Sequence, residues 1–274
     1  MSGDNRTVQV CLEPAVLQLT LNRPECGNAM NLAMVAELRQ ALKSVRDDRR
    51  CRAIVIRGRG DHFCTGGDIK EMALAGGRAA NGDGEAAYEQ LNRAYGQLLV
   101  ELNQAPQFTL VLTHGGVLGG GLGLVCASDL TIAQKNSQLG MPETRLGIPP
   151  AQIAPFVVDR IGLTRARSLA LLARRVDACA ALALGLVQQV ADDDADLTRQ
   201  SNQILAELAR CAPEATAQTK ALLLNAGHLS RPQLLDLGAR QFASAVCGNE
   251  GQEGTRAFTQ KRRPGWADET MEVR

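Results

Sequence analysis

The chain has few aromatic residues, almost no net charge and no long apolar run, and each scarcity excludes a class of protein. Phe, Trp and Tyr make up 3% of the 274 residues, and 30 basic residues stand against 29 acidic ones. Without a basic surface or stacking side chains, a nucleic acid partner is not expected. No apolar run approaches the roughly 18 residues that a membrane-spanning helix needs, so no membrane partner is expected.

The cysteines lack the spacing of a metal site or a disulfide framework. All eight are isolated, with no CxxC pair and no Cys/His ligand spacing. Such residues are typical of reduced thiols that fill small apolar spaces in a cytosolic protein. The N-terminal residues MSGDNRTVQV contain no basic region followed by an apolar core, so no signal peptide is expected. We therefore expect a cytoplasmic protein without a metal.

Hydrophobic periodicity predicts an α/β core followed by a helical C-terminal appendage. The continuous apolar run Ala53–Ile56 is typical of a strand buried in a parallel sheet. Asn31 is a suitable N-cap for a helix whose apolar face carries Met34, Val35, Leu38, Leu42 and Val45. Residues 75–86 are predicted to form a loop, and residues 139–150 an irregular segment. Strands are predicted at 16–21, 53–56, 108–112, 129–133 and 186–190, and further helices at 91–102, 153–161, 164–173, 178–185, 195–210, 213–226 and 232–246.

A dense glycine cluster follows the predicted strand at 108–112. Residues 115–123 contain six glycines, of which Gly119, Gly120 and Gly121 open a predicted helix that runs to about Ala127. Glycine in a helix costs roughly 1 kcal/mol relative to alanine, so the cluster needs a reason. One is a helix N-terminus whose free N–H groups hold an oxygen that gains negative charge. The other is a glycine-lined helix that packs closely against a neighbour.

A second glycine turn stands in the same context. Thr65–Asp68 follows the predicted strand at 53–56 and opens a short helix. If the two strands are neighbours, N–H groups from both turns can converge on one point as an oxyanion hole, in which each donor contributes about 3–4 kcal/mol to transition-state stabilisation. Neither turn fits a phosphate-binding GxxxxGK[ST] or a dinucleotide-binding GxGxxG pattern.

Glu143 is the candidate acid or base. It follows Pro142 in the apolar stretch QLGMPETRLGIPP, where burial would raise the pKa of its carboxyl group. The alternative is a surface glutamate paired with Arg145. Asp68 is expected to cap a helix rather than to catalyse.

The remaining candidate nucleophiles and bases lack partners at a suitable spacing. His62, His114 and His228 show no spacing typical of a triad or a metal site, so each is expected to be structural. Ser128 has no GxSxG context and is not expected to be a nucleophile.

Five ordered segments resemble the enoyl-CoA hydratase/isomerase, or crotonase, superfamily. They are LNRPECGNAMN (21–31), GRGDHFCTGGDIKEM (58–72), GGVLGGGLGLVCASDL (115–130), GMPETRLGIPP (140–150) and AFTQKRRPGW (257–266). The resemblance implies an α/β spiral of ββα units over residues 1–194 and a helical trimerisation region over residues 195–274. It also implies an acyl-CoA thioester substrate, no cofactor other than the coenzyme A of that substrate, and a homotrimer or a hexamer built as a dimer of trimers.

Positions that match the superfamily imply roles for individual residues. Gly67 and Gly120 resemble the two N–H donors that hold the thioester oxygen as an enolate, and Glu143 matches the second of two catalytic glutamates. Phe258 and Lys261 fall where a neighbouring subunit commonly helps to cover coenzyme A. The residues that resemble the walls of the coenzyme A site are Cys26, Ala29, Gly67, Asp68, Ile69, Lys70 and Gly120.

Two departures from the superfamily pattern alter the implied site. The first catalytic glutamate falls on Gly123, which has no side chain. Either Glu143 handles both water activation and protonation at C2, or another group or a substrate carboxylate assists. The second departure is the proline-rich segment 149–155, which stiffens the region of the acyl pocket.

Within the superfamily, the segments GGGxGL and PETxLGIxPAQIAPFV together with Gly123 are most similar to isohexenylglutaconyl-CoA hydratases of acyclic terpene catabolism, relatives of methylglutaconyl-CoA hydratases. The leading hypothesis is a hydro-lyase that adds water to a β-branched glutaconyl-type 2-enoyl-CoA in terpene or leucine-type catabolism. A Δ3,Δ2-enoyl-CoA isomerase is one alternative, because a single glutamate suffices for its proton shuttle. A non-catalytic acyl-CoA-binding paralogue is the other.

Overall fold

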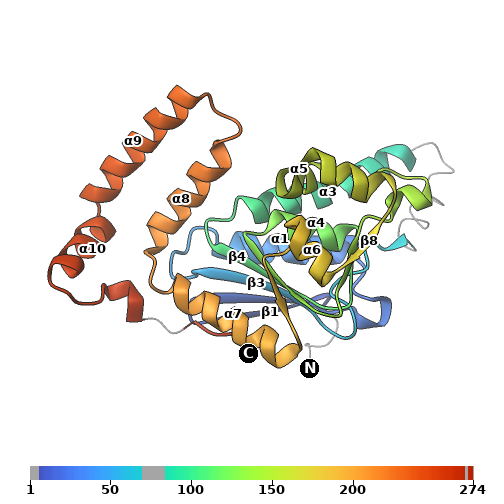
Figure 1. The fold of residues 1–274 in the computed structure, drawn as a ribbon, viewed down its shortest axis with the longest axis horizontal. Helices are drawn as coiled ribbons and strands as arrows, with labels where there is room; N and C mark the ends of the chain where they lie inside the picture. Colours follow the sequence, from blue (N-terminus) through green and yellow to red (C-terminus); the bar gives the residue numbers. More distant parts are fainter. Residues whose placement is uncertain (1–5, 70–83, 269–270, 274) are drawn as a thin grey trace.

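The computed structural model describes residues 6–69, 84–268 and 271–273, and a twisted sheet lies at the centre of this part of the chain (Figure 1). Six strands pair in the order β1-β2-β3-β4-β6-β9, and three more form a small sheet in the order β5-β7-β8. In the large sheet β1 pairs antiparallel with β2, and the other neighbours pair in parallel. The strands are β1 (Val8–Glu13), β2 (Val16–Leu21), β3 (Ala53–Gly58), β4 (Phe108–Thr113), β5 (Gly116–Leu118), β6 (Leu130–Gln134), β7 (Gln138–Gly140), β8 (Arg175–Asp177) and β9 (Gln189–Ala191).

Helices cover both faces of the large sheet (Figure 1). Helices α1, α3, α4, α5 and α6 lie on one face, and α7 lies on the other. The α-helices are α1 (Leu32–Val45), α3 (Gly84–Asn103), α4 (Gly120–Ala127), α5 (Ala154–Leu171), α6 (Ala178–Leu184), α7 (Asp194–Leu208), α8 (Pro213–Asn225), α9 (Arg231–Cys247) and α10 (Asn249–Thr259), and the 3₁₀ segments are η1 (Pro24–Cys26), η3 (Glu143–Leu146) and η4 (Gly265–Asp268).

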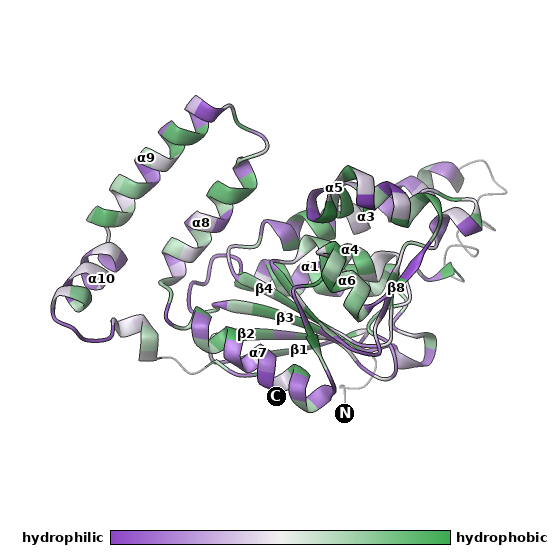
Figure 2. Ribbon diagram, viewed as in Figure 1, coloured by the Kyte–Doolittle hydropathy of each residue, from purple (hydrophilic) through white to green (hydrophobic). Residues whose placement is uncertain are grey.

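The central strands are rich in apolar residues because both of their faces are buried. Ile54 and Ile56 of β3 pack in the cluster under α1, α3 and α4, whereas Val55 packs in the second cluster beneath the sheet, against residues of α7. Figure 2 shows the same strands as almost uniformly hydrophobic. The prediction that 53–56 is a buried parallel strand is therefore confirmed.

Helix α1 follows the predicted periodicity. The side chain of Asn31 accepts a hydrogen bond from the Met34 N–H at 2.9 Å, which satisfies one free donor of the first turn. All five residues of the predicted apolar face are buried, each at most 6% exposed. Local sequence thus determined both the start of this helix and the face that it packs against the sheet.

Several predicted boundaries differ from the structure. The two helices predicted at 153–161 and 164–173 are present as two helical stretches of α5, and a kink at Gly162, whose φ of 76° and ψ of 157° are not helical, separates them as expected. The last strand is β9 at 189–191 rather than 186–190. Strands β1, β5, β7 and β8 and helix α10 were not predicted, and β7 includes the first two residues of the segment predicted to be irregular. Residues 70–83, which include most of the loop predicted at 75–86, lie outside the described residues, and 84–86 belong to α3.

The predicted helical C-terminal region, which starts at 195, falls into two parts. Helix α7 packs against the sheet through Leu197, Ile204, Leu205 and Leu208. Helices α8, α9 and α10, which we call the C-terminal arm, extend away from the sheet (Figure 1). The helices that leave the core thus begin with α8.

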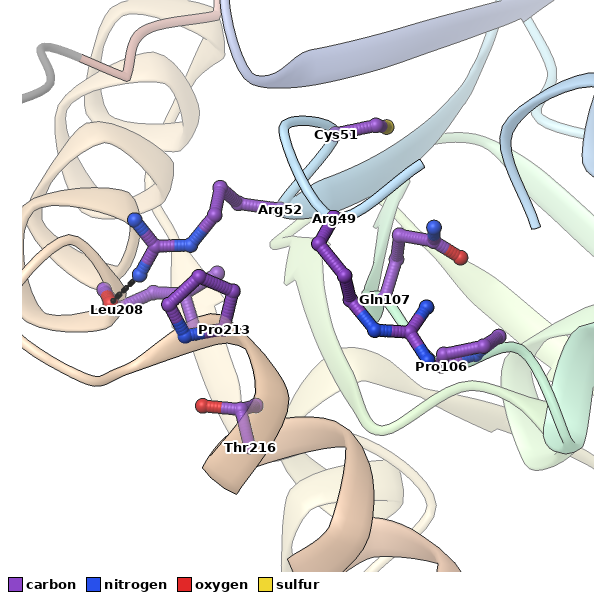
Figure 3. A pocket seen from close by; sticks show the side chains of 8 residues that line it. All are labelled: Arg49, Cys51, Arg52, Pro106, Gln107, Leu208, Pro213 and Thr216. Carbon is purple, nitrogen blue, oxygen red and sulfur yellow. Dashed lines mark hydrogen bonds between the residues drawn. The ribbon is translucent and has the colours of Figure 1, made fainter. Parts of the chain in front are cut away.

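A small pocket lies at the junction between the arm and the core. Figure 3 shows the guanidinium group of Arg52 beside α7, where it donates to the Leu208 carbonyl at 3.0 Å, and it also donates to the Cys211 carbonyl. The pocket is lined by Arg49, Cys51, Arg52, Pro106, Gln107, Leu208, Pro213 and Thr216. None of the site residues predicted from the sequence lies in it.

Lys220 of α8 binds the arm to the sheet. Its Nζ lies 2.7 Å from the Asp129 carboxylate and donates to the Gln107 carbonyl at 3.1 Å. Burial lowers the pKa of Lys220, and the nearby Asp129 carboxylate offsets part of this effect. The ammonium group is therefore held in the junction by its partners.

We predict that Lys220→Met destabilises the protein by about 3 kcal/mol, because removal of one member of a buried pair leaves the other charge uncompensated. Urea denaturation provides the measurement. Lys135→Met is the matched control, since Lys135 and its partner Asp192 are 68% and 80% exposed and such pairs contribute about 1 kcal/mol or less. Equal losses for the two variants would contradict the structural role given to Lys220.

Candidate active site

The two glycine turns lie side by side. The segment after β3 pairs with β5 through a parallel bridge between Cys64 and Val117. The Leu118 N–H donates to the Cys64 carbonyl at 2.9 Å, and the Cys64 N–H donates to the Gly116 carbonyl at 3.0 Å. Because β3 and β4 are neighbours in the sheet, their carboxyl ends deliver the two turns to the same edge. The neighbouring strands that the sequence prediction required are present.

Glycine is needed in these turns for two physical reasons. Gly66 and Gly119 have φ values of 110° and 49°, in the left-handed region that other residues rarely adopt. A Cβ atom at Gly121 would lie 2.6 Å from the Cys64 carbonyl oxygen, so this glycine allows α4 to pack against the first turn. The cluster therefore serves close packing, one of the two reasons that the sequence left open, and also a backbone conformation that other residues rarely adopt.

The N–H groups of Gly67 and Gly120 have no partner among the described residues. Hydrogen bonds flank Gly67, from the Met30 N–H to the Gly66 carbonyl at 2.8 Å and from the Asp68 N–H to the Met30 carbonyl at 2.9 Å. Gly120 is the first residue of α4, where N–H groups lack an intrahelical acceptor. Two backbone donors are thus available at adjacent turns.

Glu143 lies beside these turns. It begins η3 and is half-buried, and a Cβ atom at Gly119 would be 2.8 Å from its Oε1 atom. Its Oε2 atom is buried and has no hydrogen-bond partner among the described residues. Burial raises the pKa of this carboxyl group. Arg145 is exposed, and no ion pair between the two is present in the described part of the chain, so the surface-pair alternative is not what the structure contains.

The space beside Gly123 is filled by other residues. A Cβ atom there would overlap the Tyr95 hydroxyl oxygen and would lie 2.6 Å from Ile153 Cγ2. The Tyr95 hydroxyl donates to the Gly120 carbonyl at 2.5 Å. Sequence reasoning missed Tyr95, because nothing in the local pattern of α3 distinguishes a tyrosine that reaches α4 from one that packs in the core.

The predicted coenzyme A walls come together around a second residue that the sequence prediction missed, Asn28. This buried side chain accepts from the Arg23 N–H at 2.8 Å and donates to the Arg59 and His62 carbonyls at 2.9 and 2.7 Å. Its φ of 54° is a left-handed conformation, which asparagine tolerates better than most residues. The segment that carries Cys26 and Ala29 is therefore held against the loop that precedes the first glycine turn.

Arg23 links two segments of the predicted coenzyme A wall. Its guanidinium group donates to the Ala29 carbonyl at 2.6 Å and pairs with the Asp68 carboxylate at 2.8 Å. Ile69, the next residue, is 58% exposed, so an apolar side chain lies open at the edge of this wall. Lys70 lies outside the described residues, and so does the helix that Asp68 was predicted to cap.

Phe258 and Lys261 are not brought to the site within one chain. They lie on and just after α10, at the far end of the C-terminal arm (Figure 1). The side chain of Phe258 is 85% exposed. Lys261 has a left-handed backbone conformation, with a φ of 53°. Their predicted role requires a neighbouring subunit and stays a prediction.

The remaining candidates have structural surroundings. His62 Nδ1 accepts from the Gly116 N–H at 3.0 Å, and His114 Nε2 lies 2.7 Å from the Gly60 carbonyl oxygen. Ser128 donates to the Val125 carbonyl at 2.8 Å at the end of α4. All eight cysteines are free thiols. Across the described ranges, no helix is long and apolar enough to span a membrane, and no group of three His, Cys, Asp or Glu side chains could hold a metal ion.

Comparison with known proteins identifies the class. The solved structure of Pseudomonas aeruginosa AtuE matches with a TM-score of 0.92 and 56% identity, covering 96% of this chain and 100% of that one. The fold is the α/β crotonase fold. Residues 12–269 match the family described as enoyl-CoA hydratase/isomerase, and the chain belongs to that family.

Curated relatives of this family carry both activities in their names. A probable enoyl-CoA hydratase of Bacillus subtilis is 31% identical over 259 residues, covering 94% of this chain and 97% of the relative. A trans-2-decenoyl-[acyl-carrier-protein] isomerase of Streptococcus mutans is 26% identical over 262 residues, covering 95% of this chain and 98% of the relative. The chain is an enzyme of the enoyl-CoA hydratase/isomerase type, and its family implies an acyl-CoA thioester substrate.

We predict that Gly123→Ala lowers the stability of the protein by about 1–3 kcal/mol, because the added methyl group overlaps Tyr95 and Ile153 in a packed site. Thermal unfolding followed by circular dichroism measures the change. Gly227→Ala serves as the control, since a Cβ atom at that position has no neighbour within 4 Å. An unchanged melting temperature for Gly123→Ala would mean that the site has room for a side chain.

Proposed function

We propose that the enzyme is a hydro-lyase that adds water to a β-branched glutaconyl-type 2-enoyl-CoA, such as isohexenylglutaconyl-CoA or 3-methylglutaconyl-CoA. The observation that carries this proposal is the half-buried Glu143 carboxylate, which lies beside two glycine turns with free N–H groups. The relatives named as hydratases support the reaction type. The resemblance of the segments around Gly119 and Glu143 to isohexenylglutaconyl-CoA hydratases supports the substrate class.

The reaction needs one carboxylate and two backbone donors. The Glu143 carboxylate takes a proton from water while the water oxygen bonds to C3. The electrons of the C2=C3 double bond move toward the thioester oxygen, and the resulting enolate accepts hydrogen bonds from Gly67 and Gly120. Protonated Glu143 then returns its proton to C2 as the carbonyl re-forms. One hydrogen and one hydroxyl group are added across the double bond, and the carboxylate is regenerated.

Assembly completes the proposed site. The C-terminal arm exposes apolar side chains that have no cover within the described chain, namely Leu223, Leu235, Phe242, Val246 and Phe258. Figure 2 shows apolar residues along α8 and α9, which project from the core. We infer that they are buried between subunits of a homotrimer or hexamer, where Phe258 and Lys261 of one subunit cover the coenzyme A of the next. The enzyme would act in the cytoplasm and need no further cofactor.

We predict that Glu143→Gln lowers kcat by about 100-fold or more, because an amide cannot accept and return the proton. Stopped assays with an enoyl-CoA measure kcat, and an unchanged rate would eliminate the mechanism. Removal of the buried charge should not lower the melting temperature at neutral pH, which separates lost chemistry from a lost fold.

The raised pKa of Glu143 also gives a pH dependence. Catalysis needs the ionised carboxylate, so kcat/KM should fall as the pH drops through the pKa of this group. Because burial raises that pKa, the acid limb should lie above the ordinary glutamate value of 4.5. A rate that stays constant to below pH 4.5 would contradict this assignment.

Product analysis in ¹⁸O-labelled water tests the reaction type. A panel of crotonyl-CoA, 3-methylglutaconyl-CoA, isohexenylglutaconyl-CoA and a 3-enoyl-CoA would be offered to the enzyme. We expect the label in the 3-hydroxy product of the branched glutaconyl thioesters. A shifted double bond without label would identify an isomerase, which the Streptococcus mutans relative and the single glutamate favour as the second candidate. Binding without turnover would identify a non-catalytic paralogue.

A further inference from the structure

We propose that the hydroxyl oxygen of Tyr95 holds the attacking water opposite Glu143 and so takes the place of the side chain that Gly123 lacks. This inference rests on the proposed hydration reaction. It assigns a role to a residue of α3 that neither the sequence pattern nor the resemblance identifies. Tyr95 acts as a hydrogen-bond acceptor for a reactant and exchanges no proton.

The position of the hydroxyl group supports this role. A Cβ atom on Gly123 would overlap the Tyr95 hydroxyl oxygen, so the phenol occupies the place where a side chain on residue 123 would begin. A Cβ atom on Gly120 would lie 3.5 Å from the same oxygen, which puts the hydroxyl group next to the α4 N-terminus. Tyr95 and Glu143 therefore flank adjacent residues of one turn, since Glu143 Oε1 lies beside Gly119.

The hydrogen bonding of Tyr95 leaves its oxygen free to accept. Its proton is donated to the Gly120 carbonyl at 2.5 Å, and no described residue donates to its oxygen. A phenol has one proton to donate and lone pairs that can accept, so a water molecule can donate to Tyr95 while it donates its other proton to Glu143. This arrangement orients the water oxygen and leaves the proton transfer to the carboxylate.

The electrostatics keep the phenol in the required form. Burial raises the pKa of Tyr95 well above its ordinary value, and the Glu143 carboxylate adds to this effect. The phenol therefore stays neutral at the pH at which Glu143 is ionised. A neutral acceptor opposite one carboxylate also avoids the repulsion that two close carboxylates would have.

Tyr95→Phe tests the proposal, because it removes the hydroxyl oxygen and keeps the ring that fills the space beside Gly123. We expect kcat for hydration to fall by about 10- to 100-fold, in line with the loss expected when a reactant is misplaced. KM should change little, since the coenzyme A walls are untouched. Tyr88→Phe is the matched control, as the only other tyrosine of the chain stands seven residues earlier on α3, about 10 Å away along the axis.

Hydrogen exchange distinguishes water positioning from a structural effect on Gly120. Exchange of the C2 protons of a saturated acyl-CoA into D₂O requires Glu143 and the two N–H donors but no attacking water. We expect Tyr95→Phe to exchange at nearly the wild-type rate while its hydration is slow. Equal losses of exchange and hydration would overturn the proposal, because Tyr95 would then act only by supporting the Gly120 turn. Unchanged hydration would overturn it as well.

A failure of the proposed hydration reaction can be distinguished from a failure of the role of Tyr95. If the wild-type enzyme incorporated no ¹⁸O from water into any enoyl-CoA, hydration itself would be eliminated and the role of Tyr95 would fall with it. If the wild type hydrated and Tyr95→Phe hydrated equally well, only the role of Tyr95 would be eliminated.

Discussion

The pairing of Cys64 with strand β5 is the constraint on which the site depends. It joins two glycine turns that follow neighbouring parallel strands, and the Cys64–Val117 bridge sets their separation. The Cys64 N–H and carbonyl, the Gly116 carbonyl and the Leu118 N–H are used in this pairing, whereas the N–H groups of Gly67 and Gly120 just beyond it have no acceptor among the described residues. The edge of this sheet thus provides two backbone N–H donors. They require no side chain and need no rearrangement during a reaction.

Polar side chains hold the segments around these turns in place. Asn28 and Arg23 link the segment at 23–30 to the loop at 59–62 and to Asp68. Because these groups are buried or half-buried, each hydrogen bond also removes the cost of an unsatisfied donor or acceptor. Glu143 differs from Asn28 and Arg23. It keeps one buried oxygen without a described partner, and a group of this kind is more typical of a functional site than of a structural one.

The C-terminal arm follows a different principle from the core. Helices α9 and α10 have amphipathic sequences, and several large apolar side chains of α8 to α10 are exposed in a single chain. The buried pair of Lys220 with Asp129 and the pair of Arg49 with Glu214 bind the arm to the core. The arm therefore has helical structure by local propensity and pairing within itself, and its apolar side chains are available for contacts between chains.

Features that depend on neighbours along the chain could be predicted from the sequence. The Asn31 cap, the buried face of α1, the apolar strand β3 and the glycine turns at 66–67 and 119–121 could all be predicted, because periodicity and capping are local properties. Folding was needed to establish the surroundings of Glu143, the fit of Tyr95 against Gly123 and the two hydrogen bonds that Asn28 donates to the Arg59 and His62 carbonyls. These contacts join residues far apart in sequence, and a residue's own segment carries no signal of which distant atom will fill the space beside it.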